Sequence, residues 1–361
     1  MSEHLPPYLS GGGTRRKLTQ KRRREPSRLY TVRPSPRFRR RWLLVPLIGI
    51  AALVAIVVGS RGSGHSGGPH NAGAADSLAQ KVAPPRSLGD AAAGGGDASR
   101  FAVSLSGADL VRLRYTRATR PRAGLLFDVS TGRVLWRLNP TRQLPIASLT
   151  KMMTALLVAE RRGPHERVRI SARARHTPGS AVGVLPKRKP VQLEALLNGL
   201  LLVSGNDAAV ALAQHTGGSV AGFVRMMNER AQQLGLTCTH YTSPHGYQDA
   251  GNHSCAADLA ELARADLHLR RLRRIVRRSQ AILKFPIKGG RLFLYNHNPL
   301  VRDHYRGVTG LKTGYTDRAG QSIVATARRG STELGVVLLH SYDSGSQAER
   351  LLDRGFKAVR R

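Results

Sequence analysis

Three short strings in a fixed order constrain this chain of 361 residues more than any other feature of its sequence. They are Ser-Leu-Thr-Lys at Ser148–Lys151, Ser-Gly-Asn at Ser204–Asn206 and Lys-Thr-Gly at Lys312–Gly314. A serine becomes an acylating nucleophile when a neighbouring base takes its proton, and a neutral lysine amine can be that base. Each string alone is common, but their order, spacing and apolar surroundings together indicate an acyl-transfer site. The chain is therefore expected to fold so that three distant segments meet.

The first string supplies the expected nucleophile and its base. Ser148 precedes an apolar run, 149–160, that has the composition of a helix. Because residues three apart on a helix share a face, Lys151 is expected one turn from the Ser148 hydroxyl. Burial and a nearby cation such as Lys312 favour the neutral amine. The alternative is a helix that begins with a serine cap and carries a solvated lysine.

The other two strings supply partners. Ser204 and Asn206 lie between two apolar helical runs, and Gly205 breaks the pattern. We expect this loop to present the Ser204 hydroxyl as a proton relay and the Asn206 amide as a donor to substrate. An ordinary helix–helix turn with a cap is the alternative. Lys312–Gly314 lies in an expected strand, where backbone N–H groups can face an acyl oxygen and Gly314 lets a substrate approach closely.

Longer strings around these motifs resemble the serine-type D-alanyl-D-alanine carboxypeptidases, the low-molecular-mass penicillin-binding proteins of the β-lactamase-like superfamily. The resemblance covers about 121–356 and is carried by Pro145–Ala155, Leu200–Ala209, Pro244–Gly246 and Gly310–Thr316. It implies that the substrates are peptidoglycan stem peptides, from which terminal D-alanine is released. It also implies that β-lactams such as penicillin bind covalently as inhibitors, and that the enzyme needs no cofactor.

The resemblance assigns roles to individual residues. Ser148 is the acylated nucleophile, Lys151 is the general base, and Ser204 is a catalytic proton relay. The oxyanion hole uses the backbone N–H groups of Ser148 and Tyr315. The residues expected to bind substrate are Asn206, Lys312, Thr313, Gly314, Tyr315 and His297.

His297 departs from the family pattern. Many members carry arginine in the Asn-x-Asn string that here is Asn296-His297-Asn298. Because histidine is mostly neutral at pH 7, it is a weaker anchor for a substrate carboxylate. This predicts slower carboxypeptidase turnover with intact acylation chemistry, and a structural residue at a strand end is the alternative. His245 is expected to shape a loop wall, and the histidine spacings do not indicate a metal site.

Two other classes of function stay open. The first is another fate of the acyl-enzyme, as in a β-lactamase or a transpeptidase. A class A β-lactamase needs a glutamate after the second motif to position the deacylating water, whereas Glu194 with Asn198 precedes Ser204. The second is a non-catalytic wall-binding protein that keeps the fold. The intact Ser148 and Lys151 argue against it.

The first hundred residues predict where the domain works. Residues 1–41 hold 13 Lys and Arg against 2 acidic residues, which predicts a disordered cytoplasmic tail. Residues 42–59 are an uncharged apolar run long enough for a single transmembrane helix with its basic side inside. Residues 60–102, rich in Gly, Ala and Ser, are expected to be a flexible linker. The alternative to a membrane anchor is a cleaved signal peptide and a secreted enzyme.

Residues 103–361 are expected to form the catalytic domain, outside the cell membrane. This region carries 41 Lys and Arg and 17 acidic residues, so it contributes +24 to the net charge of +36. Such a charge implies attraction to a polyanion. The apolar run disfavours nucleic acid and favours anionic wall polymers or lipid headgroups, while a simple arginine bias of the sequence is the alternative.

Two cysteines, Cys238 and Cys255, bracket the loop that carries His245. A disulfide is allowed outside the membrane, and closing this loop contributes about 3 kcal/mol in the chain-entropy model. Two small buried thiols are the alternative.

The expected fold is α+β, with one antiparallel sheet flanked by helices and interrupted by a helical insert, as in β-lactamases and DD-peptidases. A hairpin is predicted at 123–128 and 134–137, and a helical middle over 149–272. The remaining strands are expected at 291–294, 308–315, 322–327 and 334–339, before a final helix at 346–359.

Overall fold

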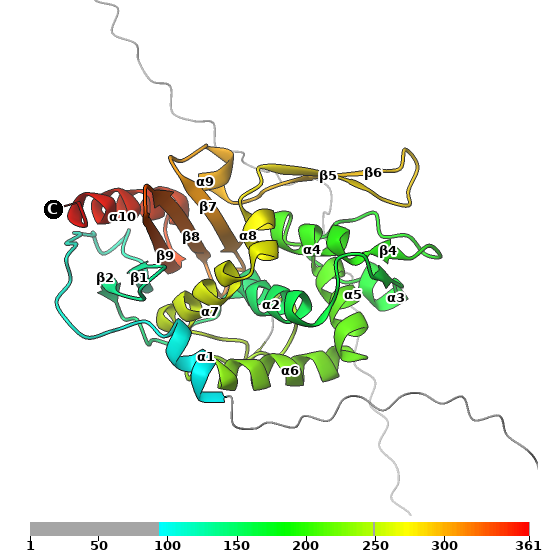
Figure 1. Ribbon diagram of the computed structural model, residues 1–361, viewed down its shortest axis with the longest axis horizontal. Coiled ribbons are helices and arrows are strands. Elements are labelled where there is room, and N and C mark those ends of the chain that lie inside the picture. The colour runs from blue at the N-terminus through cyan, green and yellow to red at the C-terminus, as the bar shows by residue number, and fades with distance from the viewer. Residues whose placement is uncertain (1–93, 248–249, 361) are drawn as a thin grey trace, which may run out of the picture. The chain divides into compact units, whose positions relative to one another are not determined.

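A five-stranded antiparallel sheet forms the centre of the computed structural model, which describes residues 94–247 and 250–360 (Figure 1). The strand order is β2-β1-β9-β8-β7. The strands are β1 (Ala123–Asp128), β2 (Val134–Leu138), β7 (Val308–Gly314), β8 (Gln321–Arg329) and β9 (Thr332–Ser341). Because β1 pairs with β9, the two ends of the domain meet in one sheet.

The β1–β2 hairpin confirms the sequence prediction, and its turn shows why. Both strands are largely apolar and buried. The Asp128 carboxylate closes the turn by accepting hydrogen bonds from the backbone N–H groups of Ser130 (2.9 Å) and Thr131 (2.8 Å). Gly132 follows with a φ of 77°, a left-handed conformation that favours glycine.

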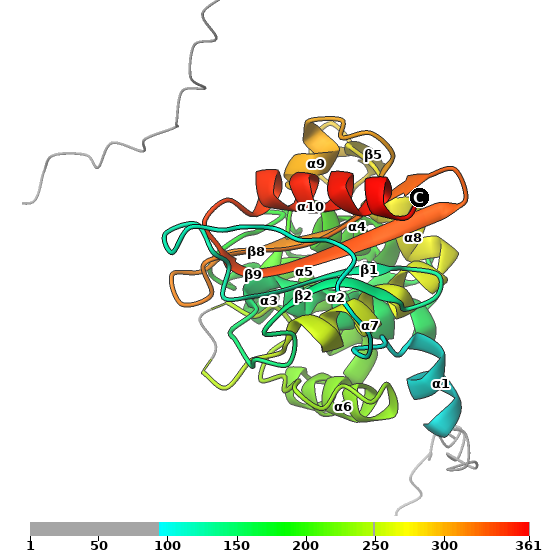
Figure 2. The same cartoon turned by 90° about the vertical axis from the view of Figure 1, so that its left-hand side faces the viewer.

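Helices cover both faces of the sheet (Figure 2). One face packs on α10 (Ser344–Ala358) around Leu351, Leu352 and Phe356. The other face packs on the larger helical part of the domain, which contacts the sheet chiefly through α7. The helices of that part are α2 (Lys151–Arg161), α3 (Ala172–Arg175), α4 (Leu193–Leu202), α5 (Asn206–Gly217), α6 (Val220–Gln233), α7 (Ala256–His268) and α8 (Arg270–Val276).

The α+β class, the antiparallel sheet and the helical insert are therefore as predicted, but the prediction is wrong for one strand. The strand expected at 291–294 forms β6 (Arg291–Tyr295), which does not join the central sheet. It pairs with β5 (Gln280–Lys284) in a separate hairpin. A second small sheet joins β3 (Arg167–Val168) and β4 (Val191–Gln192), and the short helix α9 spans Pro299–Arg302. Alternating exposure along β6 marks a strand with only one covered face.

The folded part begins before the predicted domain boundary at residue 103. Residues assigned to the linker form helix α1 (Gly94–Phe101). This helix packs on α6 and α7, and Asp97 forms an ion pair with Arg230 (2.9 Å). The predicted tail 1–41, the predicted transmembrane helix 42–59 and most of the linker lie outside the described residues. Within the described ranges, no helix has the length and apolar character needed to cross a membrane.

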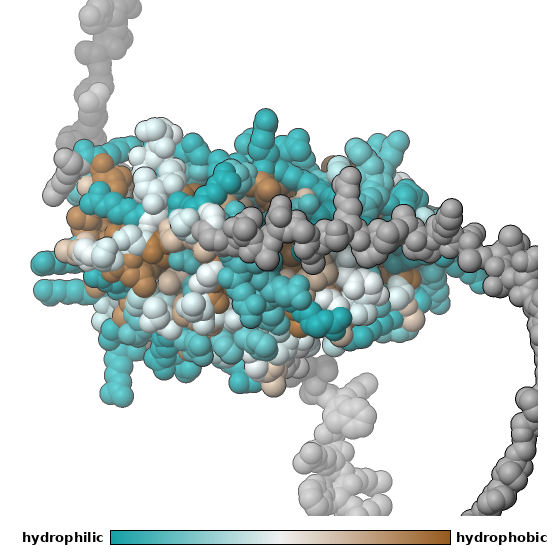
Figure 3. All heavy atoms as spheres, turned by 60° about the horizontal axis from the view of Figure 1, so that its bottom comes forward, coloured by the Kyte–Doolittle hydropathy of each residue, from teal (hydrophilic) through white to brown (hydrophobic). Residues whose placement is uncertain are grey.

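The surface reflects the basic composition. Hydrophilic side chains cover most of the face in Figure 3, and apolar side chains appear in smaller groups among them. Exposed large apolar side chains on the described residues include Ile282, Phe293 and Tyr295 of the β5–β6 hairpin, and Tyr315 and Tyr342 near the ends of β7 and β9.

Candidate active site

The nucleophile string folds as predicted into a helical turn. A 3-10 turn, Ala147–Thr150, leads directly into α2, so Ser148 and Lys151 lie on the same side. The Lys151 Nζ lies 2.7 Å from the Ser148 Oγ. Lys151 is fully buried, whereas Ser148 is partly exposed. The pair can therefore pass a proton between an accessible hydroxyl and a sheltered amine.

Two glycines lie close against the backbone of this turn, where a residue with a side chain would not fit. A Cβ on Gly246 would overlap the carbonyl oxygen of Ala147, and a Cβ on Gly314 would lie 2.9 Å from that of Ile146. Ala147 itself has a φ of 47°, which is uncommon for a residue with a side chain. Gly314 was expected to make room for substrate. The structure gives a further reason for it, because β7 passes directly beside the backbone of the nucleophile turn.

The loop that carries Pro244-His245-Gly246 holds α2 through main-chain carbonyls. Lys151 donates to the carbonyl of His245 (2.9 Å), and Thr154 donates to the carbonyl of Pro244 (2.7 Å). Burial, with the positive charges of Lys151 and Arg173, lowers the pKa of the His245 ring to about 4. The ring is therefore neutral at pH 7, and its Nδ1 accepts a hydrogen bond from the Tyr247 backbone.

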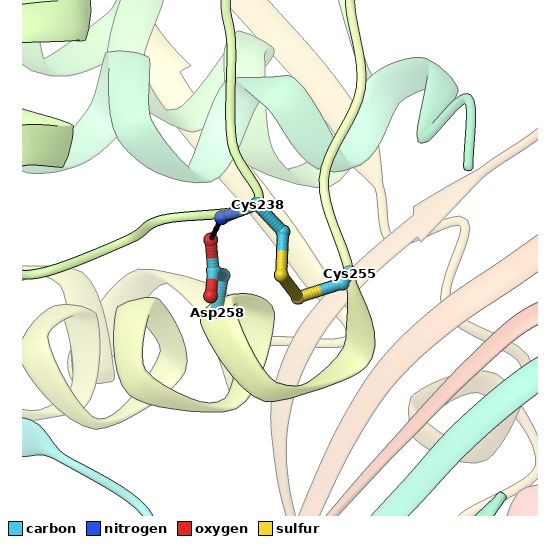
Figure 4. A group of neighbouring side chains, drawn as sticks. All are labelled: Cys238, Cys255 and Asp258. Atoms are coloured by element: carbon cyan, nitrogen blue, oxygen red, sulfur yellow. Dashed lines mark hydrogen bonds between the residues drawn. A yellow bond between two sulfur atoms is a disulfide. The ribbon is translucent and has the colours of Figure 1, made fainter. Parts of the chain in front are cut away.

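A disulfide between Cys238 and Cys255 closes the base of this loop, as one of the two sequence alternatives predicted (Figure 4). Asp258 lies beside it and accepts hydrogen bonds from the backbone N–H of Cys238 (2.8 Å) and the hydroxyl of Thr239 (2.6 Å). Two cysteines and a carboxylate in one place resemble a metal site. Here the sulfurs are bonded to each other and the carboxylate caps the backbone.

Ser204 occupies the turn between α4 and α5 with a φ of 61°. Its hydroxyl is buried and has no hydrogen-bond partner in the described part of the chain. The Ser204 hydroxyl can therefore form a hydrogen bond with a substrate or relay a proton.

Asn206 is buried and already engaged. Its Nδ2 donates to the carbonyl of Pro178 (2.7 Å) and its backbone N–H to that of Ser180 (2.6 Å). Asp207 accepts from the backbone N–H groups of Val182 and Gly183, both at 2.9 Å. The second string therefore holds the segment 178–183 against the site, a contact that the sequence did not indicate. One N–H of the amide expected to donate to substrate donates to this segment, and the amide Oδ1 has no hydrogen-bond partner within the described residues.

Lys312 lies on β7 and is buried. Its Nζ donates to the carbonyl of Thr313 (2.8 Å). Burial lowers the pKa of Lys312 to about 7, so the amine is half-protonated near neutral pH. The second cation predicted near Lys151 is therefore one whose charge depends on pH.

These segments surround a cleft of about 390 Å³. Its lining includes Ser148, Ser204, His297, Thr313, Gly314 and Tyr315 from the predicted site, together with Ser180, Pro299, Arg302, Gln321, Ser322 and Ser344. Asn206, Lys151 and Lys312 are buried and are not among the lining residues.

The cleft contains a cation that the sequence did not reveal, Arg302. Asn296 fixes the end of the β5–β6 hairpin by donating to the carbonyls of Val276 (3.1 Å) and Arg278 (2.8 Å). Asn298 caps α9 by accepting from the Leu300 backbone (3.1 Å), and α9 ends at Arg302. The two asparagines of the Asn-His-Asn string thus build a short helix that brings an arginine to the cleft.

His297 is a poor cation in this setting. Desolvation lowers the pKa of its ring, and the positive charges of Lys312 and Arg302 lower it further. Arg302 therefore offers the cleft a second group that can contact a carboxylate, beside the His297 that the sequence predicted.

Comparison with known proteins agrees with this geometry. Residues 115–342 match the D-alanyl-D-alanine carboxypeptidase family, peptidase family S11. The chain is 32% identical to the carboxypeptidase DacF of Bacillus subtilis, over 66% of this chain and 63% of that protein. It is 33% identical to DacB2 of Mycobacterium tuberculosis, over 64% of this chain and 81% of that protein. It spans only 52% of DacA of Haemophilus influenzae, at 36% identity.

Solved structures share the fold. A D-alanyl-D-alanine carboxypeptidase from Mycobacterium tuberculosis superposes with a TM-score of 0.63 at 31% identity, over 68% of this chain and 94% of that one. The Streptomyces K15 DD-transpeptidase, in a point-mutant form, superposes with a TM-score of 0.62 at 28% identity, over 68% of this chain and all of the other. The chain therefore belongs to the D-alanyl-D-alanine carboxypeptidase family, peptidase family S11.

Proposed function

We propose that this protein is a serine D-alanyl-D-alanine carboxypeptidase that trims peptidoglycan stem peptides. The observation that carries the proposal is the 2.7 Å contact between an accessible Ser148 hydroxyl and the buried Lys151 amine at one cleft. Ser148 Oγ attacks the carbonyl that joins the two terminal D-alanines, and Lys151 takes its proton. The proton passes to the leaving amine and releases D-alanine. Water then cleaves the Ser148 ester and restores the enzyme.

The remaining residues have supporting roles in this proposal. Ser204, whose hydroxyl has no partner among the residues that the structure describes, relays the proton toward the leaving group. The backbone N–H groups of Ser148 and Tyr315 stabilise the oxyanion, a contribution of roughly 3–4 kcal/mol for each such donor. Asn206 holds the segment 178–183 through one N–H of its side-chain amide, and the second N–H is the donor that we assign to the substrate. Lys312 supplies positive charge, and Thr313 helps to bind the terminal carboxylate.

The direct test uses the full-length protein. Incubation with penicillin should add one penicillin mass, and peptide mapping should place it on Ser148. Incubation with a peptide that ends in D-Ala-D-Ala should release one D-alanine for each peptide. A protein that takes up no penicillin and releases no D-alanine would be the non-catalytic wall binder instead.

A second candidate is supported by the likeness to the Streptomyces K15 DD-transpeptidase. In that case an amine of another stem peptide, rather than water, attacks the Ser148 ester. Adding an amine acceptor to the peptide assay separates the two, because transfer yields a joined product and hydrolysis does not. A β-lactamase is disfavoured, since Glu194 forms an ion pair with Arg271 (2.8 Å) and does not line the cleft. A penicillin adduct that lasts only seconds would restore that candidate.

We also propose that Arg302 replaces the missing family arginine as anchor for the terminal carboxylate. It lines the cleft, and the described residues contain no acidic partner for it. Arg302→Gln should lower kcat/KM for D-Ala-D-Ala peptides by about 10- to 100-fold, because a charge-assisted hydrogen bond is worth roughly 1.5–3 kcal/mol.

The matched control is Arg306→Gln, an exposed arginine four residues further on that does not line the cleft. It should leave kcat/KM unchanged. Adding His297→Arg to the Arg302→Gln protein should restore part of the loss by returning a cation to the cleft. Equal losses from Arg302→Gln and Arg306→Gln would rule out a specific anchor.

Acylation should depend on pH through Lys312. Since the pKa of this amine is lowered to about 7, its charge is lost as the pH rises through neutrality. The rate constant for penicillin acylation should therefore fall on the alkaline side with a midpoint near pH 7. Lys312→Arg keeps its charge and Lys312→Gln never has one, so neither should show this midpoint. A midpoint that persists in both variants would assign the titration to another group.

For the rest of the chain we propose an uncleaved membrane anchor at 42–59, with the catalytic domain outside and the basic residues 1–41 inside. The support is the uncharged apolar run and the arginines that precede it. An enzyme that trims peptidoglycan has to meet its substrate outside the cell membrane, which requires such a location. Mass spectrometry of the mature N-terminus decides between this anchor and cleavage after residue 59, which would give a secreted enzyme.

A further inference from the structure

A second cavity lies between α10 and the segment 112–119, which runs alongside that helix (Figure 2). Its volume is about 750 Å³. Two hydrogen bonds tie the segment to the helix: Gln347 Nε2 donates to the carbonyl of Thr119 (2.6 Å), and Arg354 donates to that of Arg112 (3.3 Å). The chain between these ties spans the hollow, so the cavity is built by the fold.

Arginines line both walls of this cavity. They are Arg112 and Arg114 on the segment and Arg350 and Arg354 on α10. None of them belongs to an ion pair within the described part of the chain, whereas Arg230, Arg271 and Arg329 elsewhere do. Asp343 is the acidic residue of the lining, and its carboxylate caps α10 by accepting from the Ser346 backbone (3.1 Å). Four guanidiniums against one carboxylate leave the lining of the cavity with a net positive charge.

The uncharged lining adds a donor and an aromatic surface. The Tyr115 hydroxyl is buried without a hydrogen-bond partner in the described residues, and its ring packs beside Trp136 with 6.1 Å between centroids. Burial raises the pKa of Tyr115 to about 12, so the hydroxyl keeps its proton and can donate. Tyr342 at the rim is 70% exposed. Guanidinium groups and an unpartnered phenol are suited to phosphate oxygens, which accept several hydrogen bonds at once.

This cavity adjoins the active-site cleft. Ser344 lines the cleft, while the two preceding residues, Tyr342 and Asp343, line the cavity. Gly345, at the start of α10, packs against Pro299 of α9, which also lines the cleft. The residues at the start of α10 therefore contribute to the lining of both hollows.

We propose that this cavity binds a phosphate-bearing polyanionic strand. Its volume exceeds the space needed for one anion, and four guanidiniums on two facing walls, none of them in an ion pair within the described residues, match a ligand with several closely spaced charges. A polymer strand can enter a hollow of this kind, whereas the flat surface of a bilayer cannot. The proposal concerns binding alone and does not depend on the peptidase activity.

The test measures binding of fluorescent inorganic polyphosphate to the full-length protein by anisotropy at several salt concentrations. The variant Arg114→Gln/Arg350→Gln removes two exposed arginines that make no hydrogen bond in the described structure. It should bind at least about tenfold more weakly at 0.15 M salt. The slope of log K against log salt should fall by about 1.5, since each lost phosphate contact accounts for roughly 0.7–0.9.

The matched control is Arg274→Gln/Arg277→Gln, which removes the same charge from exposed arginines at the end of α8. It leaves the basic residues 1–41 in place, as the test variant does, and should bind as the wild type does. Hydrogen exchange should show that polyphosphate protects 110–119 and α10. Equal weakening in both double variants, or no protection there, would overturn the proposal. Protection by phosphatidylglycerol vesicles but not by polyphosphate would also overturn it, in favour of a membrane contact.

Discussion

Ser148→Ala is expected to abolish both covalent penicillin labelling and D-alanine release. The variant lacks the hydroxyl oxygen that we propose forms the acyl-enzyme, so the rate should fall on the order of 10⁶-fold, as when other serine hydrolases lose their nucleophile. Labelling is measured by mass spectrometry of the intact protein, and D-alanine release by an amino-acid assay. The fold should survive, because the partly exposed Ser148 side chain makes a single hydrogen bond within the described residues, to Lys151.

The matched control is Ser180→Ala, a serine that lines the same cleft and has no assigned role. It should be labelled within a few-fold of the wild-type rate. Thermal unfolding of both variants shows that each protein is folded. Penicillin retained by Ser148→Ala on another serine would overturn the assignment of the whole site.

Lys151→Ala is expected to slow acylation by about 10²–10⁴-fold, which is the typical effect of losing a general base. The hydroxyl remains, but the amine that lies 2.7 Å from it in the wild type is gone. Alanine also leaves a void at a fully buried position and frees the His245 carbonyl. The variant Lys151→Met fills much of the same space without an amine, so it separates loss of the base from loss of packing. The second-order rate constant for penicillin acylation measures the effect.

Both Lys151 variants should lose the same catalytic factor, while Lys151→Met should unfold at the higher temperature of the two. Acylation of Lys151→Met within tenfold of the wild type would show that another group is the base. The buried Lys312, whose pKa lies near 7, is then the first candidate.

The part of the fold that sequence predicted well is the part with local signals. The hairpin 123–138 combines buried apolar strands with a turn that Asp128 closes through its own neighbours. The helices of the insert follow apolar periodicity. The sequence predicts the strand β6, but it does not predict the partner strand β5, and it assigns β6 to the central sheet instead of to a separate hairpin. Strand pairing is a tertiary contact that the pattern of a single strand does not encode.

The candidate site likewise has a part that rests on local signals and a part that rests on contacts between distant residues. Ser148 and Lys151 could be paired from sequence because their contact is made within one helical turn. The roles of Arg302, Asn206 and the segment 178–183 depend on contacts between residues far apart in the chain. The sequence shows the Asn-His-Asn string, but only the folded α9 shows that the cation of the cleft comes from Arg302.

The order of the loop beside Lys151 depends on the disulfide, and the disulfide depends on the compartment in which the chain folds. Cys238 and Cys255, which are 17 residues apart in sequence, close a loop. The carbonyl of His245 in this loop accepts a hydrogen bond from Lys151. Without the bond, ordering that loop costs about 3 kcal/mol more in chain entropy, which the remaining hydrogen bonds must offset. In a reducing cytoplasm the thiols stay apart, and in an oxidising compartment they join. The loop that holds Lys151 is therefore constrained by the disulfide only in an oxidising compartment, and a chain that folds before it reaches one lacks this constraint.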